Sequence, residues 1–319
     1  MHLKSVARGL LTWVPPVEKL IAKSTRGTDS ARYCYSVWLR HLVLAHESGL
    51  DTDPRSVAEL GPGDSLGIGL AALLTGANHY TGLDIFEYAA AARNAAVLDG
   101  LIDLFAARSP IPDSNEFPDV KPYLPSYEFP RRILTEERLA RALARGRPDA
   151  IRRALDHLGD ETGAVSIVYR APWFDASVVR PDSIDMVYSQ AVLEHVDDLD
   201  TTYEALAAWV RPGGFVSHEV SFYSHKLTPE WNGHWTISAP VWKLIRGRRP
   251  YLLNREPAST HIRLVKHSGL RIVNEVPVRV KSDVARERLA RRFRTLTDED
   301  LTTKSLFVQA VKPSVPPAF

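Results

Sequence analysis

Short apolar stretches alternate with longer amphipathic ones along most of the chain. The short stretches predict buried strands, because β-branched and other apolar residues fill them without a helical period. They cover residues 55–60, 79–85, 165–169, 184–188 and 215–220. Apolar residues recur at helical spacing around and between them, at 30–47, 66–75, 86–98 and 199–210. This alternation predicts an α/β fold built on a parallel sheet with helices on both faces.

The two ends of the chain extend this pattern. Residues 270–280 and 304–311 predict two final strands, the second a candidate antiparallel hairpin partner, with a helix at 286–294 between them. Near the N-terminus, the apolar run 9–14 predicts a short amphipathic helix that Pro15 and Pro16 end. Gly100 is placed to end the helix that begins at residue 86.

One long segment breaks the alternation after the second strand–helix unit. It is rich in proline at first and then in arginine with a helical pattern, and a connection of this length favours a lid or a substrate-specificity element. The predicted organisation is an N-terminal helical cap at 1–54, a first βαβ half at 55–102, this large insert at 103–162 and the remaining core at 163–319. Within that core, residues 218–257 are expected to bind an acceptor.

Composition narrows the class of protein. The 319 residues carry 40 Lys and Arg against 38 Asp and Glu, a net charge of +2, which removes the global electrostatic argument for a nucleic-acid partner. Cys34 is the only cysteine, so an intrachain disulfide and a multi-cysteine metal site are both excluded, as expected for a cytoplasmic protein. No apolar stretch is long enough for a transmembrane segment. We expect a small-molecule substrate, and the oligomeric state stays open.

A glycine turn follows the first predicted strand. Gly61 and Gly63 stand where a strand passes into a helix, so a ligand can approach the backbone and use the amides at the helix N-terminus. Asp84 ends the next strand, 21 residues after Gly63. A carboxylate at this position can accept hydrogen bonds from two ribose hydroxyls, and it can equally cap the following helix. The pair predicts a nucleotide-like cofactor.

Four motifs in order resemble class I S-adenosylmethionine (SAM)-dependent methyltransferases of the small-molecule, type 11-like kind. They are Val57–Gly63 with Gly67, then Asp84, then Ser183–Val196, and finally Trp209–Gly214. The resemblance covers residues 55–102, the implied SAM-binding half, and residues 163–222. It implies a Rossmann-like seven-stranded sheet, the cofactor S-adenosyl-L-methionine and transfer of a methyl group.

The resemblance also implies which side chains bind the cofactor. The predicted cofactor-binding residues are Glu59, Gly61, Gly63, Asp84, Trp173, Ser189 and Gln190. The chain departs from the family after the third strand, where Arg170-Ala171-Pro172-Trp173 replaces an acidic residue that many members place near the adenine amino group. Trp173 is therefore predicted either to stack on adenine or to belong to the core.

The acceptor is expected beyond the carboxyl ends of the fourth and fifth strands, where ligands bind in open α/β sheets. Histidines and aromatic residues are frequent there, which suits a sugar or another polyhydroxylated acceptor and predicts O-methylation. The predicted substrate-binding residues are His195, His218, Glu219, Tyr223, Trp231, Asn232 and Trp235. His225 and His234 are the candidate general bases, although each histidine has a structural alternative.

Three alternatives stay open. No compact ligand spacing supports a metal, and none is predicted, although His218, Glu219, His225 and His234 offer ligands for a divalent cation. A catalytically silent SAM-binding partner protein would carry the same cofactor motifs. An NAD(P)-dependent Rossmann oxidoreductase is less favoured, because the third glycine of its motif would fall at Leu66.

Overall fold

One seven-stranded sheet organises the chain, as the sequence predicted. The computed structural model describes residues 3–13, 28–144, 146–173, 175–249 and 252–314. The strands lie in the order β3-β2-β1-β4-β5-β7-β6, and β7 is antiparallel to both of its neighbours. They are β1 (Ser56–Leu60), β2 (His79–Leu83), β3 (Ser166–Arg170), β4 (Ile184–Gln190), β5 (Val210–Ser221), β6 (Arg271–Arg279) and β7 (Thr303–Val311).

The strand order reverses between β1 and β4. From β1 the chain proceeds outward through β2 to β3, then returns to form β4 on the other side of β1. Leu60, the last residue of β1, pairs in parallel with Ser189 of β4, and Gln190 pairs with Glu219 of β5. The carboxyl ends of these strands therefore meet at one edge, where open α/β sheets bind their ligands.

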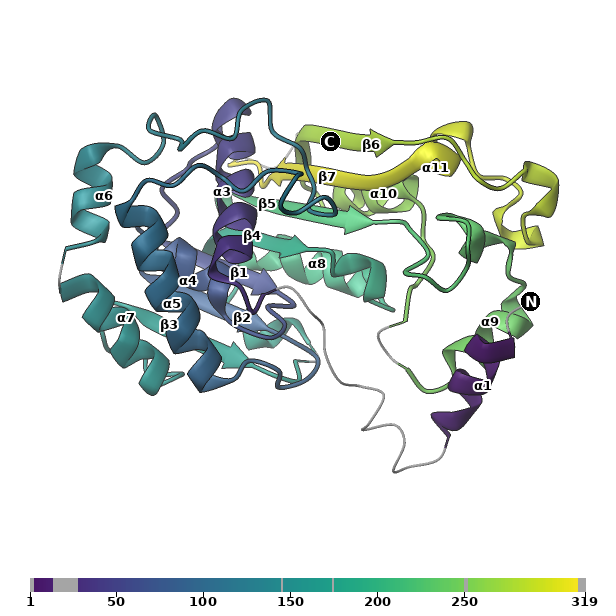
Figure 1. Ribbon diagram of the computed structural model, residues 1–319, viewed down its shortest axis with the longest axis horizontal. Helices are drawn as coiled ribbons and strands as arrows, with labels where there is room; N and C mark the ends of the chain where they lie inside the picture. Colours follow the sequence, from purple (N-terminus) through teal and green to yellow (C-terminus); the bar gives the residue numbers. More distant parts are fainter. Residues whose placement is uncertain (1–2, 14–27, 145, 174, 250–251, 315–319) are drawn as a thin grey trace.

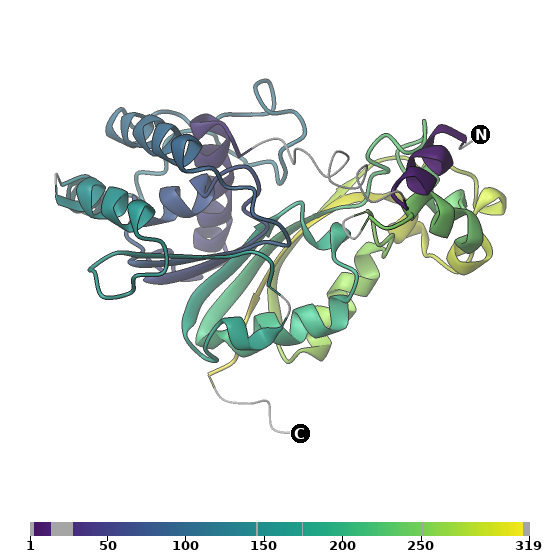
Figure 2. The ribbon, with the colours of Figure 1, turned by 90° about the horizontal axis from the view of Figure 1, so that it is seen from below.

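Helices cover both faces of the sheet (Figures 1 and 2). On one face, α3 (Ala31–Glu47), α4 (Gly67–Leu73) and α5 (Ala91–Ala106) pack against one another over the first strands. On the other, α8 (Leu199–Trp209) and α10 (Ala258–His267) pack beneath β5, β6 and β7. Each layer encloses its own hydrophobic core. None of the described helices is long and apolar enough to span a bilayer.

Two expectations about helices are wrong. α5 runs through Gly100 instead of ending there. A Cβ at Gly100 would lie 2.8 Å from the Ala31 Cβ, so the glycine allows α5 to pack closely on α3 rather than capping a helix. The helix predicted at 286–294 is replaced by two single 3₁₀ turns, η4 (Arg286–Arg288) and η5 (Arg291–Phe293). Leu289, between the turns, and Phe293 are the buried residues of this segment that reach the core.

The two N-terminal helices lie in different places. α3 lies in the main core, and its N-cap Ser30 accepts a hydrogen bond from the Tyr33 amide. α1 (Leu3–Leu11) instead packs on α9 (Ala239–Arg246), where Gly9 touches the Leu244 carbonyl closely enough to leave no room for a Cβ. Part of the predicted run 9–14 lies outside the described residues. α1 therefore supports the predicted acceptor segment rather than the sheet.

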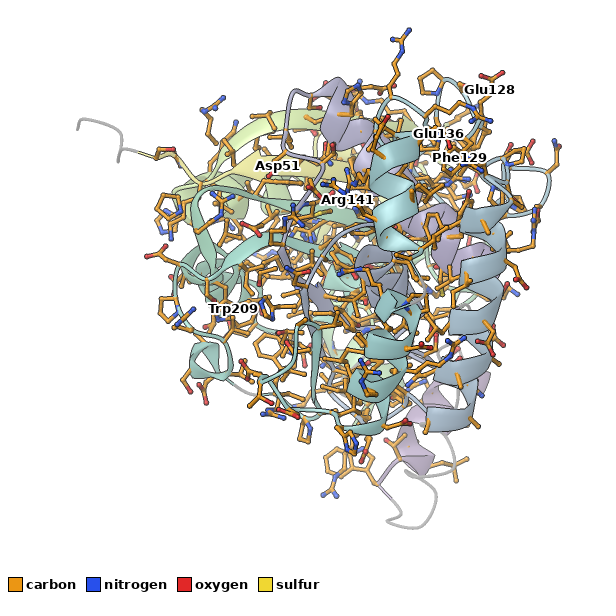
Figure 3. All side chains as sticks on the ribbon, turned by 90° about the vertical axis from the view of Figure 1, so that its left-hand side faces the viewer. Asp51, Glu128, Phe129, Glu136, Arg141 and Trp209 are labelled. Carbon is orange, nitrogen blue, oxygen red and sulfur yellow. The ribbon has the colours of Figure 1, made fainter. Side chains whose placement is uncertain are left out.

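Residues between α5 and β3 are held against the helical layer by buried arginines. Arg40 of α3 is completely buried and donates to the carbonyl oxygens of Pro112 at 3.0 Å and Pro122 at 2.5 Å. Figure 3 shows this segment from its outer side, with α6 (Glu136–Ala142) at the front, and α7 (Gly146–Asp156) follows α6 in the chain. Arg138 and Arg147 donate to carbonyls at the end of α4, of Thr75 and Leu73. Closure of this segment as a lid stays a prediction.

The proline-rich loop should depend on Arg40. Arg40→Ala leaves the buried Pro122 carbonyl without its guanidinium donor, at about 1–3 kcal/mol, while the Pro112 carbonyl keeps its hydrogen bond from Ser36 Oγ. We expect urea unfolding to show a loss of about 1–3 kcal/mol in the free energy of unfolding, together with faster proteolysis within residues 107–134. Arg32→Ala is the matched control on the same helix, since its exposed ion pair with Glu116 contributes about 0–1 kcal/mol. Equal losses in the two variants would contradict this account of the loop.

Candidate active site

The glycine turn and Asp84 lie together at the carboxyl edge of the sheet. The Gly63 amide donates to Asp84 Oδ2 at 3.1 Å, and the Ile85 amide donates to Oδ1 at 2.7 Å. Gly61 and Gly63 have φ angles of 65° and 73°, which favour glycine. Asp84 is 6% exposed, and burial raises the pKa of its carboxyl against the opposing effect of these amides. The spacing of 21 residues between Gly63 and Asp84 thus corresponds to a direct hydrogen bond between them.

Two residues that the sequence analysis did not select, Asn94 and Thr28, accept hydrogen bonds from backbone amides after the glycine turn. The Leu66 amide donates to Asn94 Oδ1 of α5 at 2.9 Å, and the Ser65 amide donates to Thr28 Oγ1 at 3.1 Å. These amides at the start of α4 already have protein partners, so they are not the open donors that the turn motif suggested. No local pattern marks Asn94 or Thr28, since each reaches the turn only through the packing of a distant segment.

Glu59, a predicted cofactor-binding residue, lies inside the protein beneath α4. It is 2% exposed, and its Oε2 accepts hydrogen bonds from Tyr80 at 2.7 Å and Tyr188 at 3.1 Å. Burial raises the pKa of Glu59 to about 8, with the two hydroxyls opposing that shift. The side chain therefore ties β1 to both neighbouring strands, and its role toward a cofactor stays a prediction.

The segment after β4 folds over the glycine turn. The side chain of Val192 lies so close that a Cβ on Gly61 would be 2.6 Å from its Cγ2. The amide of Ala191 donates to the Glu219 carbonyl at 3.0 Å, and the single turn η2 (Leu193–His195) follows. The carboxyl ends of β1, β4 and β5 are thereby joined into one site.

Two carboxylates and two imidazoles gather at this end of β4 and β5. We call Glu194, His195, Glu219 and His225 the acid–histidine cluster. Glu194 Oε1 lies 3.9 Å from His225 Nε2, and the two imidazole ring centres are 5.0 Å apart. Tyr223 stacks on the His225 ring at 4.0 Å and fixes its plane. Sequence reasoning selected three of these four residues and missed Glu194, although it adjoins His195 directly after a strand end.

Burial controls the charge of the cluster. It raises the pKa of Glu194 well above its ordinary value, and the neighbouring Glu219 adds to that shift. Burial likewise raises the pKa of Glu219 to about 8, with Lys121 opposing it. The pKa of His225 falls to about 3 through burial and the proximity of His195. The imidazole of His225 is therefore neutral at physiological pH and presents a lone pair.

The backbone around the cluster is strained. Ala191, His225, Lys226 and Arg255 have positive φ angles of 54°, 49°, 63° and 69°. Such conformations are unfavourable for residues with a Cβ, and they persist where the surrounding structure imposes them, often at functional sites. Their concentration here agrees with a binding or catalytic role for this end of the sheet.

Comparison with known families found a methyltransferase domain in the chain. A family model described as a methyltransferase domain matches residues 148–217, which include β3, β4, α8 and most of β5. The glycine turn and Asp84 lie on the same sheet, outside the matched residues. The chain therefore carries a SAM-dependent methyltransferase domain. The predicted enzyme class and the predicted cofactor are thereby confirmed, and no curated protein matches the chain.

Solved structures similar to this methyltransferase are distant in sequence. A structure from Haloferax volcanii, of a methyltransferase with the Trm112 methyltransferase activator, is 16% identical with a TM-score of 0.40, covering 88% of this chain and 90% of that one. A SAM-dependent methyltransferase from Methanosarcina mazei is 13% identical with a TM-score of 0.43, covering 85% and 97%.

Haemonchus contortus phosphoethanolamine N-methyltransferase 2, solved with SAM, is 16% identical with a TM-score of 0.41. The alignment covers 86% of this methyltransferase but 53% of the nematode enzyme, so the chain spans about half of that protein. Similarity at these levels does not extend to a substrate or a partner.

Several predicted site residues of the methyltransferase lie outside the acid–histidine cluster. Ser189 Oγ and His218 Nδ1 are 2.8 Å apart inside the sheet, where both side chains are completely buried. Gln190 lies at the edge of the cluster, where its Nε2 donates to Glu219 Oε2 at 3.3 Å. Trp173 packs edge-to-face on Trp209 at 5.5 Å, while its amide donates to the Asp84 carbonyl at 3.2 Å. Trp173 therefore joins the core and still lies beside the turn.

Three predicted substrate-binding residues instead hold the acceptor segment together. Trp231 Nε1 donates to the Lys281 carbonyl at 2.9 Å, and Trp235 Nε1 donates to the Arg255 carbonyl at 3.0 Å. Asn232 is completely buried and donates to Ser282 Oγ at 2.7 Å. With their polar hydrogens engaged in this way, these side chains fix the segment after β5, and direct substrate contact by them stays a prediction.

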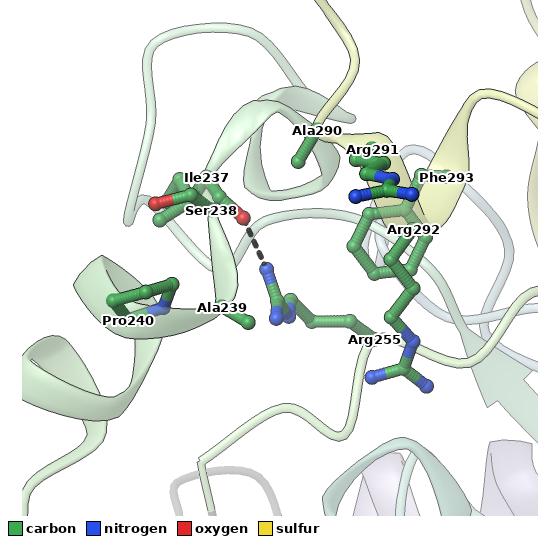
Figure 4. Close-up of a pocket in the computed structure, with 9 residues that line it drawn as sticks. All are labelled: Ile237, Ser238, Ala239, Pro240, Arg255, Ala290, Arg291, Arg292 and Phe293. Atoms are coloured by element: carbon green, nitrogen blue, oxygen red, sulfur yellow. Dashed lines mark hydrogen bonds between the residues drawn. The ribbon is translucent and has the colours of Figure 1, made fainter.

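His234 borders a small cleft beside the cluster. The cleft is also lined by Glu194, Tyr223 and Arg255, and burial lowers the pKa of His234 to about 3. On the far side of Arg255 lies a separate cavity of about 230 Å³ (Figure 4). Arg255 donates to the Ile237 carbonyl at 2.7 Å and lies between the rings of Trp242 and Phe293. This packing positions the backbone next to His234.

Glu59 should make stability depend on pH. The pKa of the Glu59 carboxyl is 4.5 in the unfolded chain and about 8 in the folded protein. Its contribution to the stability of the fold is therefore fully present below pH 4.5. Between these values the unfolded chain ionises first, so stability falls as pH rises, by up to about 1.4 kcal/mol per pH unit. Glu59→Gln keeps an acceptor for both tyrosines and cannot ionise. We expect thermal melts to show the variant gaining stability over wild type between pH 5 and 8.

The exposed Glu47→Gln of α3 provides the control for this measurement and should follow wild type at every pH. A constant difference between Glu59→Gln and wild type across that range would contradict a protonated, buried Glu59.

Proposed function

We propose that the enzyme transfers the methyl group of SAM to a hydroxyl of a small polyhydroxylated acceptor, such as a sugar. One observation carries this proposal: the acid–histidine cluster presents buried hydrogen-bond acceptors directly beside the glycine turn. Neither oxygen of Glu194 has a hydrogen-bond partner of good geometry among the described residues, and neither does His225 Nε2. Buried acceptors need donors, and a ligand rich in hydroxyl groups supplies them.

The cofactor is proposed to bind at Gly61, Gly63 and Asp84. The residues suit SAM, because the buried Asp84 carboxylate can accept hydrogen bonds from ribose hydroxyls and the turn lets a ligand approach the backbone. When bound, SAM supplies an electrophilic methyl group on a sulfonium. Ser189 and Gln190 are the last two residues of β4, the strand next to β1. Trp173 lies beside the turn, since its amide donates to the Asp84 carbonyl.

The chain's own contribution to the reaction is alignment and proton transfer. The acceptor oxygen must lie in line with the methyl carbon and the sulfur, so that the new C–O bond forms as the C–S bond breaks. The hydroxyl proton then passes to a neutral imidazole, for which His225 and His234 are the candidates. Both face Glu194, His225 directly and His234 across the small cleft.

Cofactor binding should depend on Asp84. Asp84→Ala removes a charged acceptor whose hydrogen bonds contribute about 1.5–3 kcal/mol each. We expect calorimetry to show SAM binding to wild type and at least about tenfold weaker binding to the variant. Asp99→Ala, an exposed acid on α5, is the control and should bind as wild type does. Equal affinity of wild type and Asp84→Ala would exclude this cofactor site.

Turnover should depend on the proposed base. His225→Ala and His234→Ala are compared at saturating SAM, with a panel of monosaccharides and nucleotide sugars and release of S-adenosylhomocysteine as the readout. Loss of the base should lower turnover about 10²–10⁴-fold while SAM affinity stays unchanged. The exposed His267→Ala serves as control. If both variants stay within a few fold of wild type, neither histidine is the base; if wild type binds SAM but transfers nothing, the silent binding partner is favoured.

A further inference from the structure

Glu194, His195 and His225 each offer one potential ligand atom within the same small region. These three atoms, a carboxylate oxygen and two imidazole nitrogens, all lie within 4.8 Å of one another. We propose that they bind one divalent transition-metal ion of the zinc class. This inference deepens the proposed function, since it concerns the same end of the sheet, but its test does not require turnover.

The geometry needs little adjustment. Four ligands around zinc at bonds of about 2.0–2.1 Å lie about 3.3 Å from one another. The 3.9 Å between Glu194 Oε1 and His225 Nε2 therefore has to shorten by about 0.6 Å, and no pair of the three atoms, all within 4.8 Å of one another, has to shorten by more than about 1.5 Å. Tyr223 already holds the His225 ring by stacking. Small side-chain rotations therefore suffice to bring the three atoms to bonding distance of one ion.

Burial of Glu194 without donors gives a second argument. Glu194 is 2% exposed, and both its oxygens lack a hydrogen-bond partner of good geometry among the described residues. Glu219, a second carboxyl group at this end of the sheet, is 3% exposed. A buried carboxyl oxygen without a partner is unfavourable, because burial removes the water that would solvate it. A divalent cation supplies a partner at the Glu194 oxygens.

The ligand set selects the metal. Two imidazoles with one carboxylate suit Zn²⁺, Co²⁺, Mn²⁺ or Fe²⁺, whereas Mg²⁺ and Ca²⁺ prefer sites made of oxygen. Three protein ligands leave a coordination position for an acceptor hydroxyl. His225 is then a ligand and cannot accept a proton, which leaves His234, outside the triad, as the base.

Metal binding can be measured directly on the full chain after treatment with a chelator. Co²⁺ is the probe, because its visible absorption reports a site with nitrogen ligands, and Zn²⁺ competition gives the relative affinity. We expect wild type to bind one Co²⁺ per chain and Zn²⁺ to displace it. Glu194→Gln and His225→Asn should each bind Co²⁺ at least tenfold more weakly, whereas Mg²⁺ in excess should not compete.

Matched controls separate the site from adventitious surface binding. His267→Asn and Glu275→Gln change an exposed histidine and an exposed acid elsewhere, and both should bind Co²⁺ as wild type does. SAM calorimetry and thermal melting establish that each variant is folded, and His195→Asn replaces Glu194→Gln if the latter is not. Absence of saturable one-to-one binding to wild type, or unchanged binding in the ligand variants, overturns the proposal. Failure to find an acceptor would leave the metal measurement intact and bear only on the proposed function.

Discussion

The pairing of β1 with β4 is the constraint on which the rest of this methyltransferase depends. Leu60 and Ser189 are neighbours across these parallel strands, so the segments that follow them leave the sheet at the same edge. The first segment becomes the glycine turn, and the second carries Val192 over Gly61 before it reaches Glu194. The proposed cofactor site and the proposed acceptor site are thereby held side by side. Without this strand reversal, the two halves would belong to unrelated surfaces.

Buried polar groups in this protein fall into two kinds. His41 lies 2.7 Å from Ser217 Oγ, and His261 lies 2.9 Å from the Tyr203 hydroxyl, so each of these core imidazoles has one nitrogen satisfied by a hydroxyl. Each such contact joins a helix to the sheet or to another helix. At Glu194 the carboxylate is equally buried, yet no side chain donates to it among the described residues. That difference supports the ligand-binding role proposed for Glu194.

The arginine-rich segment shows how burial can reverse an expectation based on composition. An arginine-rich helical pattern by itself indicates a solvated face. Arg138 instead is mostly buried and donates to the Thr75 and Thr52 carbonyls, beyond the C-terminal end of α4 and before β1. Carbonyls at a helix C-terminus lack partners within the helix and carry partial negative charge, so a guanidinium satisfies both needs. Here the cations serve the fold.

The sequence by itself determined the strands, the glycine turn and its contact with Asp84, because these follow from local periodicity and from the regular return of βαβ units to one edge. It also determined that His195 and His225 follow strand ends and that Glu219 lies near the end of its strand. Only the tertiary structure decided that Glu194 completes their cluster, that Asn94 satisfies the start of α4, and that Trp231, Asn232 and Trp235 face their own segment. These outcomes depend on which distant surfaces meet and on which polar atoms burial leaves without partners. Neither the contacts between distant surfaces nor the burial of individual polar atoms can be read from the local spacing of residues.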